Sequence, residues 1–223
     1  PQDHGWLKPG HHFSFADYYD PEHMGFGPLR VWNDDPIKAG AGFPTHPHRD
    51  MEIITYVRRG AVSHEDSLGN RGRTAAGQVQ VMSAGAGIRH AEFNQEGEDL
   101  DLFQVWVEPD EIGYQPRWDT RTFDRERVSN GFVTLVSGRH GREHPDALFI
   151  HQDAAFLAAV MGEGETLEQS IEPGRRAYLV PARGEVEVNG VLVPERGSAA
   201  ITFETALSIK ALREAEVVMF DLP

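Results

Sequence analysis

Short runs rich in Val, Ile, Phe and Tyr recur along the whole chain, separated by Gly, Pro, Asn and Asp. Such runs between turn residues are typical of β-strands. We predict strands at residues 29–32, 52–57, 78–82, 101–107, 132–136, 178–181, 185–188, 199–203 and 216–220. The Asn189-Gly190 pair that follows 185–188 predicts a two-residue hairpin. Helical patterning is sparse, and only DAAFLAAV at 153–160 suggests two helical turns. The pattern therefore predicts an all-β protein built as a sandwich or barrel.

Two parts of the chain resemble each other weakly. In both, a strand ends in a glycine, Gly60 or Gly184, and a second strand and a turn follow. Further on, GQVQVMSAG from Gly77 is echoed by GSAAITFET from Gly197 at nearly the same separation. This repeat predicts two β-barrels joined near residues 116–130, where charged and turn residues cluster. We expect domains at residues 1–125 and 126–223.

Composition narrows the possible functions. Against 21 Lys and Arg, the 223 residues include 35 Asp and Glu, which gives a formal charge of −14. Nucleic-acid affinity depends on Lys and Arg, so we expect neither nucleic-acid nor membrane-surface binding. The chain has no Cys, which excludes disulfides and thiolate sites and is consistent with a cytoplasmic location. No apolar run approaches the roughly 20 residues that span a bilayer.

His46-Pro47-His48 and His90-Ala91-Glu92 are the segments with the clearest chemistry. Residues i and i+2 of a strand point to the same side, so each pair shares a face. If the two strands meet inside a barrel, three imidazoles and one carboxylate converge, a donor set suited to Fe(II), Mn, Ni, Cu, Co or Zn. The glycine spacing around them, from Gly40 to Gly60 and from Gly77 to Gly87, follows the two sequence motifs of cupins in order.

Glu52 is a rival to Glu92 as the carboxylate ligand. On one extended strand it would lie about 13 Å beyond His48, whereas Glu92 lies about 6.6 Å from His90. Cupins generally use the glutamate of the first motif, which requires the chain to bend before Glu52. Geometry favours Glu92, and the general cupin pattern favours Glu52.

Four blocks of the chain together resemble the pirin family: residues 12–35, GFPTHPHRDMEIITYV at 42–57, HEDSLGN at 64–70 and GIRHAEFN at 87–94. The resemblance implies a bicupin with one metal, Fe(II) first among the candidates, held by His46, His48, His90 and Glu92. It implies that Glu52 lies outside the ligand set and that the C-terminal barrel has lost its metal. The internal repeat agrees, because it places Ser170, Glu172, Lys210 and Leu212 at the positions of the four ligands.

Two other segments have simpler interpretations. We interpret His64, Glu65 and Asp66 as a solvated hairpin tip, because they precede the turn residues Gly69-Asn70. The aromatic segment from Phe13 to Phe26 is expected to be core, with the mouth of a pocket as the alternative.

The resemblance implies a quercetin 2,3-dioxygenase-like enzyme, in which O2 opens the central ring of a flavonol and Glu92 serves as both ligand and catalytic base. We expect a small aromatic or enol substrate and a monomeric chain. The alternative is a metal- and redox-dependent regulatory protein that binds a transcription factor or a metabolic enzyme, nuclear if the source is eukaryotic. Isomerase or sugar chemistry on the same scaffold is a third possibility, because a fold does not determine function.

Overall fold

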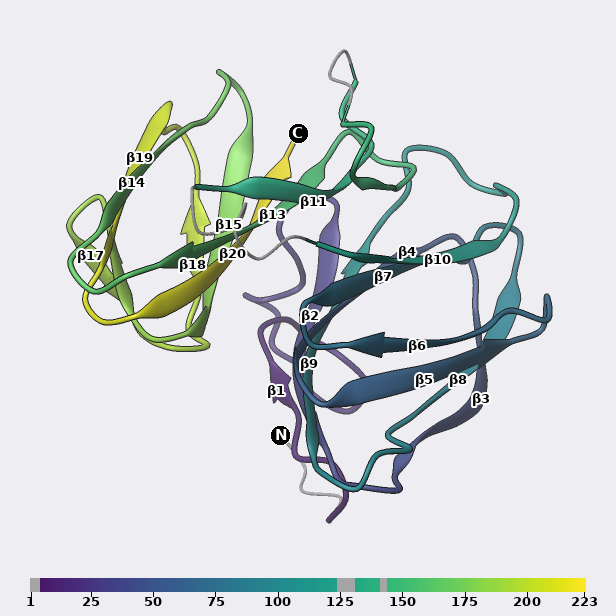
Figure 1. The fold of residues 1–223 in the computed structure, drawn as a ribbon. Coiled ribbons are helices and arrows are strands. Elements are labelled where there is room, and N and C mark those ends of the chain that lie inside the picture. The colour runs from purple at the N-terminus through teal and green to yellow at the C-terminus, as the bar shows by residue number, and fades with distance from the viewer. Residues whose placement is uncertain (1–4, 124–130, 141–143) are drawn as a thin grey trace. The chain divides into compact units, whose positions relative to one another are not determined.

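The computed structural model describes residues 5–123, 131–140 and 144–223, and within them every regular element is a β-strand (Figure 1). The chain divides into two compact units. Unit 1 comprises Pro1–Phe123 and Leu148–Gln152, and unit 2 comprises Asp124–Ala147 and Asp153–Pro223. The predicted domain boundary at 125/126 lies outside the described residues. Residues 148–152 belong to unit 1 and carry β12 (Leu148–Phe149), whereas the predicted bounds place them in the second domain.

Unit 1 has two antiparallel sheets. The larger has the order β1-β2-β9-β4-β7-β10 and the smaller β3-β8-β5-β6. The strands of the larger sheet are β1 (Gly10–His11), β2 (Leu29–Ile37), β4 (Glu52–Arg59), β7 (Gln78–Ser83), β9 (Leu100–Val107) and β10 (Arg117–Thr122). Those of the smaller sheet are β3 (Gly42–His48), β5 (Ala61–Asp66), β6 (Arg71–Ala75) and β8 (Ile88–Phe93).

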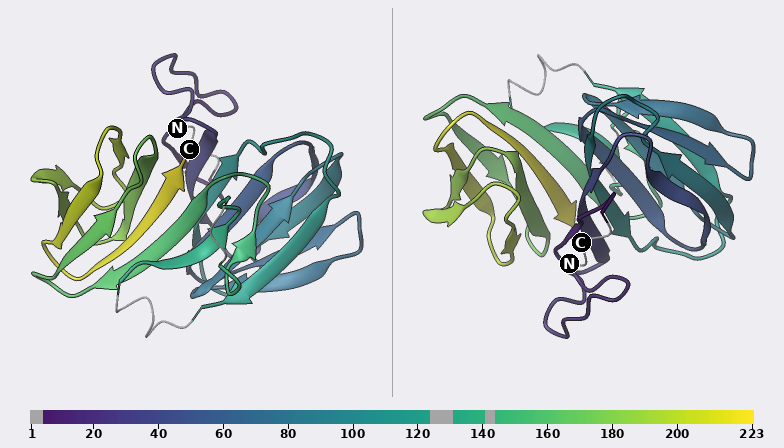
Figure 2. Two further views of the ribbon diagram at one scale, coloured as in Figure 1. Left: turned by 90° about the horizontal axis from the view of Figure 1, so that it is seen from above. Right: turned by 90° about the horizontal axis from the view of Figure 1, so that it is seen from below.

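Unit 2 repeats this topology. Its larger sheet contains β11-β13-β20-β15-β18 in that order, and its smaller sheet is β14-β19-β16-β17. The strands are β11 (Val133–Ser137), β13 (Ala155–Met161), β14 (Thr166–Ser170), β15 (Arg176–Arg183), β16 (Val186–Val188), β17 (Val191–Val193), β18 (Ala199–Ile201), β19 (Ala206–Ala211) and β20 (Ala215–Leu222). The order β2-β9-β4-β7 corresponds to β13-β20-β15-β18, and β3-β8-β5-β6 to β14-β19-β16-β17. Each unit is a barrel of two facing layers (Figures 1 and 2), so the predicted internal repeat is confirmed.

Every strand predicted from the hydrophobic runs is present, and so is the hairpin. Val188 pairs with Val191, and Asn189 and Gly190 between them have φ of 48° and 83°, as a type I′ turn requires. The predicted helix at 153–160 is wrong, because residues 155–160 belong to β13 and residues 153 and 154 precede it outside any regular element. This strand pairs with β11 on one side and β20 on the other. Pairing and burial on both faces override the helical preference of its alanines.

The interiors of the two units differ in polarity. Unit 2 is filled by apolar side chains that include Leu157, Leu179 and Ile209. Unit 1 has apolar clusters around Val62 and Met82, but it also buries His64, His90, Glu52 and Glu92, each no more than 3 % exposed. Buried polar groups are costly unless they have partners, so these side chains direct attention to the interior of unit 1.

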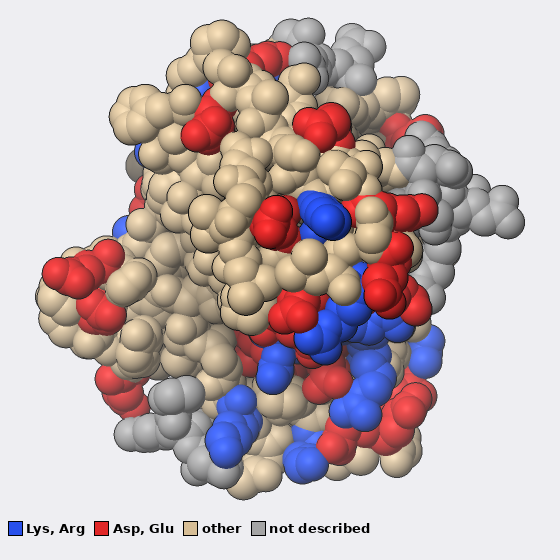
Figure 3. Space-filling view, turned by 90° about the vertical axis from the view of Figure 1, so that its left-hand side faces the viewer, with Lys and Arg blue, Asp and Glu red and all other residues tan. Residues whose placement is uncertain are grey.

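The surface carries charges of both signs. Figure 3 shows Lys and Arg interspersed with Asp and Glu on one face, and exposed ion pairs such as Arg71 with Glu65 join them. In the described residues no helix has the length and apolar character needed to cross a membrane.

Candidate metal centre

Three histidines meet where strands β3 and β8 pair. His46 and His48 alternate along β3 and therefore share a face, and His46 lies directly opposite His90 in the ladder. His46 pairs with His90 because the register of the two strands shifts between Phe43 and His46. Without the shift, the residue facing His46 would be Arg89. The bulge therefore decides which side chain of β8 joins the histidines.

The three imidazoles are close enough to share one ion. One ring nitrogen from each of His46, His48 and His90 lies within 4.8 Å of the others, and Nε2 of His46 is 3.0 Å from Nε2 of His90. Nε2 of His48 is buried and has no hydrogen-bond partner among the described residues. A buried polar atom without a partner is costly, and a coordinated cation would satisfy it. The residues present therefore fit a metal ion.

Burial keeps two of these histidines neutral. Burial, followed by the charges of His90 and His46, lowers the pKa of His48 to about 3. Burial, followed by the charges of His46 and His64, lowers the pKa of His90 to about 3. Both rings are consequently neutral at pH 7, which is the form that donates a lone pair to a metal.

Glu92 lies on the same face of β8 as His90 and is held by two amides. Its Oε1 accepts a hydrogen bond of 2.6 Å from Nε2 of Gln80, and its Oε2 one of 2.6 Å from Nε2 of Gln104. The amide oxygens of these glutamines accept from the indole N–H groups of Trp118 and Trp106. An indole nitrogen can only donate, so both amides must turn their NH2 groups toward Glu92.

Glu92 belongs to a second group of potential ligands. A carboxylate oxygen of Glu92 lies within 4.8 Å of ring nitrogens of His64 and His90. The two groups, His46–His48–His90 and His64–His90–Glu92, share His90. The structure thus brings the four predicted ligands into one region, with His90 at the junction.

Glu52 follows His46 and His48 in the sequence but lies on a different strand. β3 ends at His48, Asp50 turns the chain with φ of 47°, and Glu52 begins β4 in the other sheet. His48 and Glu52 therefore do not share one extended strand, and the distance of about 13 Å expected between them along such a strand does not apply. Glu52 accepts a hydrogen bond of 2.7 Å from Ser83 and pairs with Nδ1 of His151 at 3.1 Å.

His64 and Asp66 do not form a solvated hairpin tip; that expectation is wrong. Both are buried on β5, where Val62, His64 and Asp66 alternate inward. Nε2 of His64 is 3.0 Å from Asp66, and its Nδ1 is 3.4 Å from Nδ1 of His90. Burial opposes ionisation of Asp66, but hydrogen bonds from His64 and Asn70 bring its pKa below the usual value. Asp66 and His64 thus form a chain that ends on His90 and can orient its ring.

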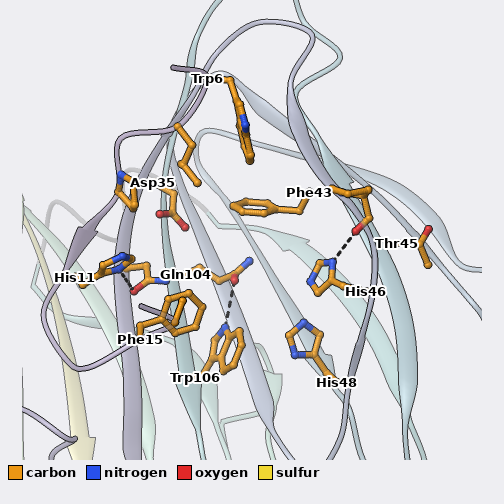
Figure 4. Close-up of a pocket in the computed structure, with 15 residues that line it drawn as sticks. Trp6, His11, Phe15, Asp35, Phe43, Thr45, His46, His48, Gln104 and Trp106 are labelled. Atoms are coloured by element: carbon orange, nitrogen blue, oxygen red, sulfur yellow. Dashed lines mark hydrogen bonds between the residues drawn. The ribbon is translucent and has the colours of Figure 1, made fainter. Parts of the chain in front are cut away.

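His46 and His48 also line a cavity of about 420 Å³ (Figure 4). The rest of its wall includes the aromatic residues Trp6, Phe15, Phe43 and Trp106 and the polar residues His11, Asn33, Asp35, Thr45 and Gln104. Cavities of small-molecule sites span about 300–1,000 Å³ and are mostly apolar. Of the N-terminal aromatic segment, Phe15 faces this pocket and Phe13 is buried in the core.

The corresponding region of unit 2 has no histidine or carboxylate at the equivalent positions and is mostly apolar. His64 faces Glu92 across β5 and β8, and Val188 faces Ile209 across the equivalent strands β16 and β19. Extending this register puts Gln169, Ile171 and Leu207 at the places of His46, His48 and His90. The constant offsets of the sequence repeat give Ser170, Glu172, Lys210 and Leu212 instead, because a constant offset takes no account of loops that differ in length between the units. The pairing of strands corrects these assignments by one to three residues.

Comparison with known proteins gives consistent matches. Residues 1–107 match the family model described as Pirin, and residues 135–222 match that of the quercetinase C-terminal cupin domain. A pirin-like protein of Caulobacter vibrioides is 55% identical over 98% of this chain and 94% of its own length. Quercetin 2,3-dioxygenase of Escherichia coli K12 is 45% identical over 99% of this chain and 94% of its own.

A solved structure agrees with these matches. The crystal structure of the bacterial pirin YhhW from Escherichia coli in complex with nickel(II) is 45% identical and superposes with a TM-score of 0.91. The match covers 100% of this chain and 94% of that one.

Proposed function

This chain belongs to the pirin family and has two cupin domains, and on that premise we propose that it is a metal-dependent dioxygenase that opens flavonols such as quercetin. The observation that carries the proposal is the convergence of three imidazoles, one with an unpartnered buried nitrogen, at the end of an aromatic-walled pocket. A planar aromatic substrate in that pocket would present its oxygen atoms to the same point.

In this proposal His46, His48, His90 and Glu92 hold one divalent ion. We propose Fe(II), with Mn, Ni, Cu, Zn and Co as competitors, because imidazole and carboxylate donors accept all of these ions. A bound transition metal lowers the pKa of a coordinated hydroxyl and supplies the redox chemistry that O2 requires.

The side chains contribute binding, proton transfer and exclusion of water. The neutral imidazoles of His48 and His90 keep their lone pairs at pH 7. Each oxygen of Glu92 accepts one amide hydrogen bond and keeps further acceptor capacity, so it can take the proton of the flavonol hydroxyl as the substrate binds. Phe43 and Trp106 wall the pocket and restrict water around the reacting ring.

An aerobic bleaching assay tests this function. The metal-loaded protein should remove the near-ultraviolet band of quercetin and release carbon monoxide and a depside, and the metal-free protein should not. Inactivity after separate loading with Fe, Mn, Ni, Cu and Co would contradict the proposal.

We also propose a monomer in the cytoplasm. All candidate ligands come from one unit of one chain, so the site needs no second copy, and a chain without Cys suits a reducing compartment. Light scattering during gel filtration tests the monomer, and fractionation of source cells tests the location.

A further inference from the structure

Asp35 is a buried acid that is not among the proposed metal ligands. It lies on β2 and is 2 % exposed, and Figure 4 shows its carboxyl directed into the pocket. Its neighbour Asp34 points to the opposite face of the strand and pairs with Arg58. No side-chain hydrogen bond or ion pair of Asp35 is found among the described residues, although it is deeply buried.

Most other polar groups of the pocket wall have partners, apart from Nε2 of His48, which belongs to the candidate metal centre, and the exposed Thr45. His11 bonds Asn33 at 2.9 Å, and Gln104 donates to Glu92. Nδ1 of His46 is 2.8 Å from the carbonyl of Pro44. Buried polar groups in proteins are nearly always satisfied. Away from the three histidines, Asp35 is the buried polar side chain of this wall without a partner among the described residues, so we expect a ligand to supply one.

The chemistry of the wall defines that ligand. Asp35 shares the pocket wall with the aromatic rings of Trp6, Phe15 and Phe43, and it lies apart from His46 and His48 along the pocket (Figure 4). Burial, followed by the charges of Asp34 and Glu92, raises its pKa to about 8, and these two neighbouring negative charges disfavour an anionic ligand. Protonated or ionised, the carboxyl accepts a hydrogen bond from a hydroxyl group. A planar ring with a hydroxyl therefore fits both the walls and the acid.

We propose that Asp35 is a specificity residue that binds a ring hydroxyl of the substrate, remote from the oxygen atoms that face the histidines. The inference rests on the proposed function, because it assigns one end of the flavonol to Asp35 and the other to the metal centre. It predicts preference for polyhydroxylated aromatic compounds over analogues that lack the remote hydroxyls.

The test compares two ligands with two variants. Quercetin and 3-hydroxyflavone share the metal-facing oxygens and differ in their ring hydroxyls. Their dissociation constants are measured without O2 on the metal-loaded protein, from quenching of tryptophan fluorescence, since Trp6 and Trp106 line the pocket. The variants are Asp35→Leu, which removes the carboxyl at similar volume, and Asp35→Asn, which keeps an acceptor. Exposed Asp119 supplies the control Asp119→Leu.

The expected result is a change in the ratio of the two constants. We expect the wild type and Asp119→Leu to prefer quercetin by about 10-fold or more, since a ligand without the hydroxyl would leave a buried acceptor unsatisfied. Asp35→Leu should reduce that preference to about 2-fold or less with one metal per chain retained, and Asp35→Asn should keep most of it.

Two results would overturn the inference. One is an unchanged preference in both Asp35 variants. The other is Asp35-dependent binding of phenethylamine instead of quercetin, which would make the residue a counter-ion for an amine. Binding is measured without turnover, so the outcome is separate from that of the bleaching assay. If the preference for quercetin depends on Asp35 but no bleaching occurs, this inference stands and the proposed dioxygenase function fails. If bleaching occurs but the preference does not depend on Asp35, this inference fails and the proposed function stands.

Discussion

At the scale of single residues, the partners of a buried carboxylate indicate its role. Glu52 is bonded to Ser83 and His151, and these contacts account for both of its oxygens. Among the residues that the structure describes, the hydrogen-bond donors to Glu92 are two amides, which leave room for a cation or a proton, and Glu92 lies on the same face of β8 as His90. The two acids that the sequence offers as rivals therefore have different surroundings.

Replacing each acid in turn tests this difference. Glu92→Ala should lower metal affinity by at least about 10- to 100-fold, the usual cost of losing even a group that only supports a ligand. Glu52→Gln should keep the metal, because the amide can still accept from Ser83. The measurement is a titration of metal into each metal-free variant.

The histidines supply the control for that titration. Each of the variants His46→Ala, His48→Ala and His90→Ala removes one of the proposed metal ligands. Each should lower the metal affinity at least as much as Glu92→Ala does. Loss of the ion in Glu52→Gln together with full binding by Glu92→Ala would reverse the assignment and restore the general cupin pattern.

At the scale of elements, the close approach of β3 and β8 builds the site. Gly42 begins β3 opposite Phe93, and a Cβ there would lie 2.2 Å from the carbonyl oxygen of Glu92 and 2.6 Å from Cα of Phe93. Both are backbone atoms and cannot move aside cheaply. Only glycine lets the two strands meet this closely beside the three histidines.

Gly42→Ala should therefore displace β3 from β8. We expect destabilisation of about 1–3 kcal/mol, the usual cost of overpacking, and weaker metal binding, because His46 and His90 are brought together by this ladder. Denaturant unfolding and metal titration measure the two effects. Gly97→Ala is the matched control, since a Cβ at Gly97 meets nothing within 4 Å. Equal stability and metal affinity in the two variants would contradict this role for Gly42.

The sequence predicts some elements much better than others. The runs rich in Val and Ile became β2, β4, β7, β9, β15 and β20, because their β preference and their burial agree. Strands β5 and β6 contain His, Asp, Arg and Gly, so their composition indicates a turn. The alternation of Val62, His64 and Asp66 was the available indication that these residues point inward.

Contacts between distant strands could not be predicted. The amides of Gln80 and Gln104 come from β7 and β9 and meet Glu92 on β8. Nothing in the local pattern links these positions. The motif spacing supplied the candidate ligands, whereas the hydrogen bonds that orient them depend on the closed barrel.

At the scale of the whole molecule, two barrels of one topology have different interiors. Unit 1 buries His90 and Glu92, and unit 2 has Leu207 and Ile209 in the equivalent places. Each unit has an apolar core of its own. Of the four equivalent positions in unit 2, Gln169 alone carries a polar side chain and none carries an imidazole or a carboxylate, so we expect one metal per chain, bound by unit 1.

Metal should therefore stabilise unit 1 directly. An ion that binds only the folded state adds about 4 kcal/mol when its free concentration is about 1,000 times its dissociation constant. All four tryptophans, Trp6, Trp32, Trp106 and Trp118, belong to unit 1, so thermal unfolding followed by tryptophan fluorescence reports on that unit alone. Metal should raise this transition in the wild type and leave it unchanged in His48→Ala. Calorimetry of the same samples also records the unfolding of unit 2. Metal should not change the unfolding temperature of unit 2 unless the two units unfold together. An equal rise in His48→Ala would mean that the stabilising ion binds elsewhere, and no rise in the wild type would mean that unit 1 is not where the metal binds.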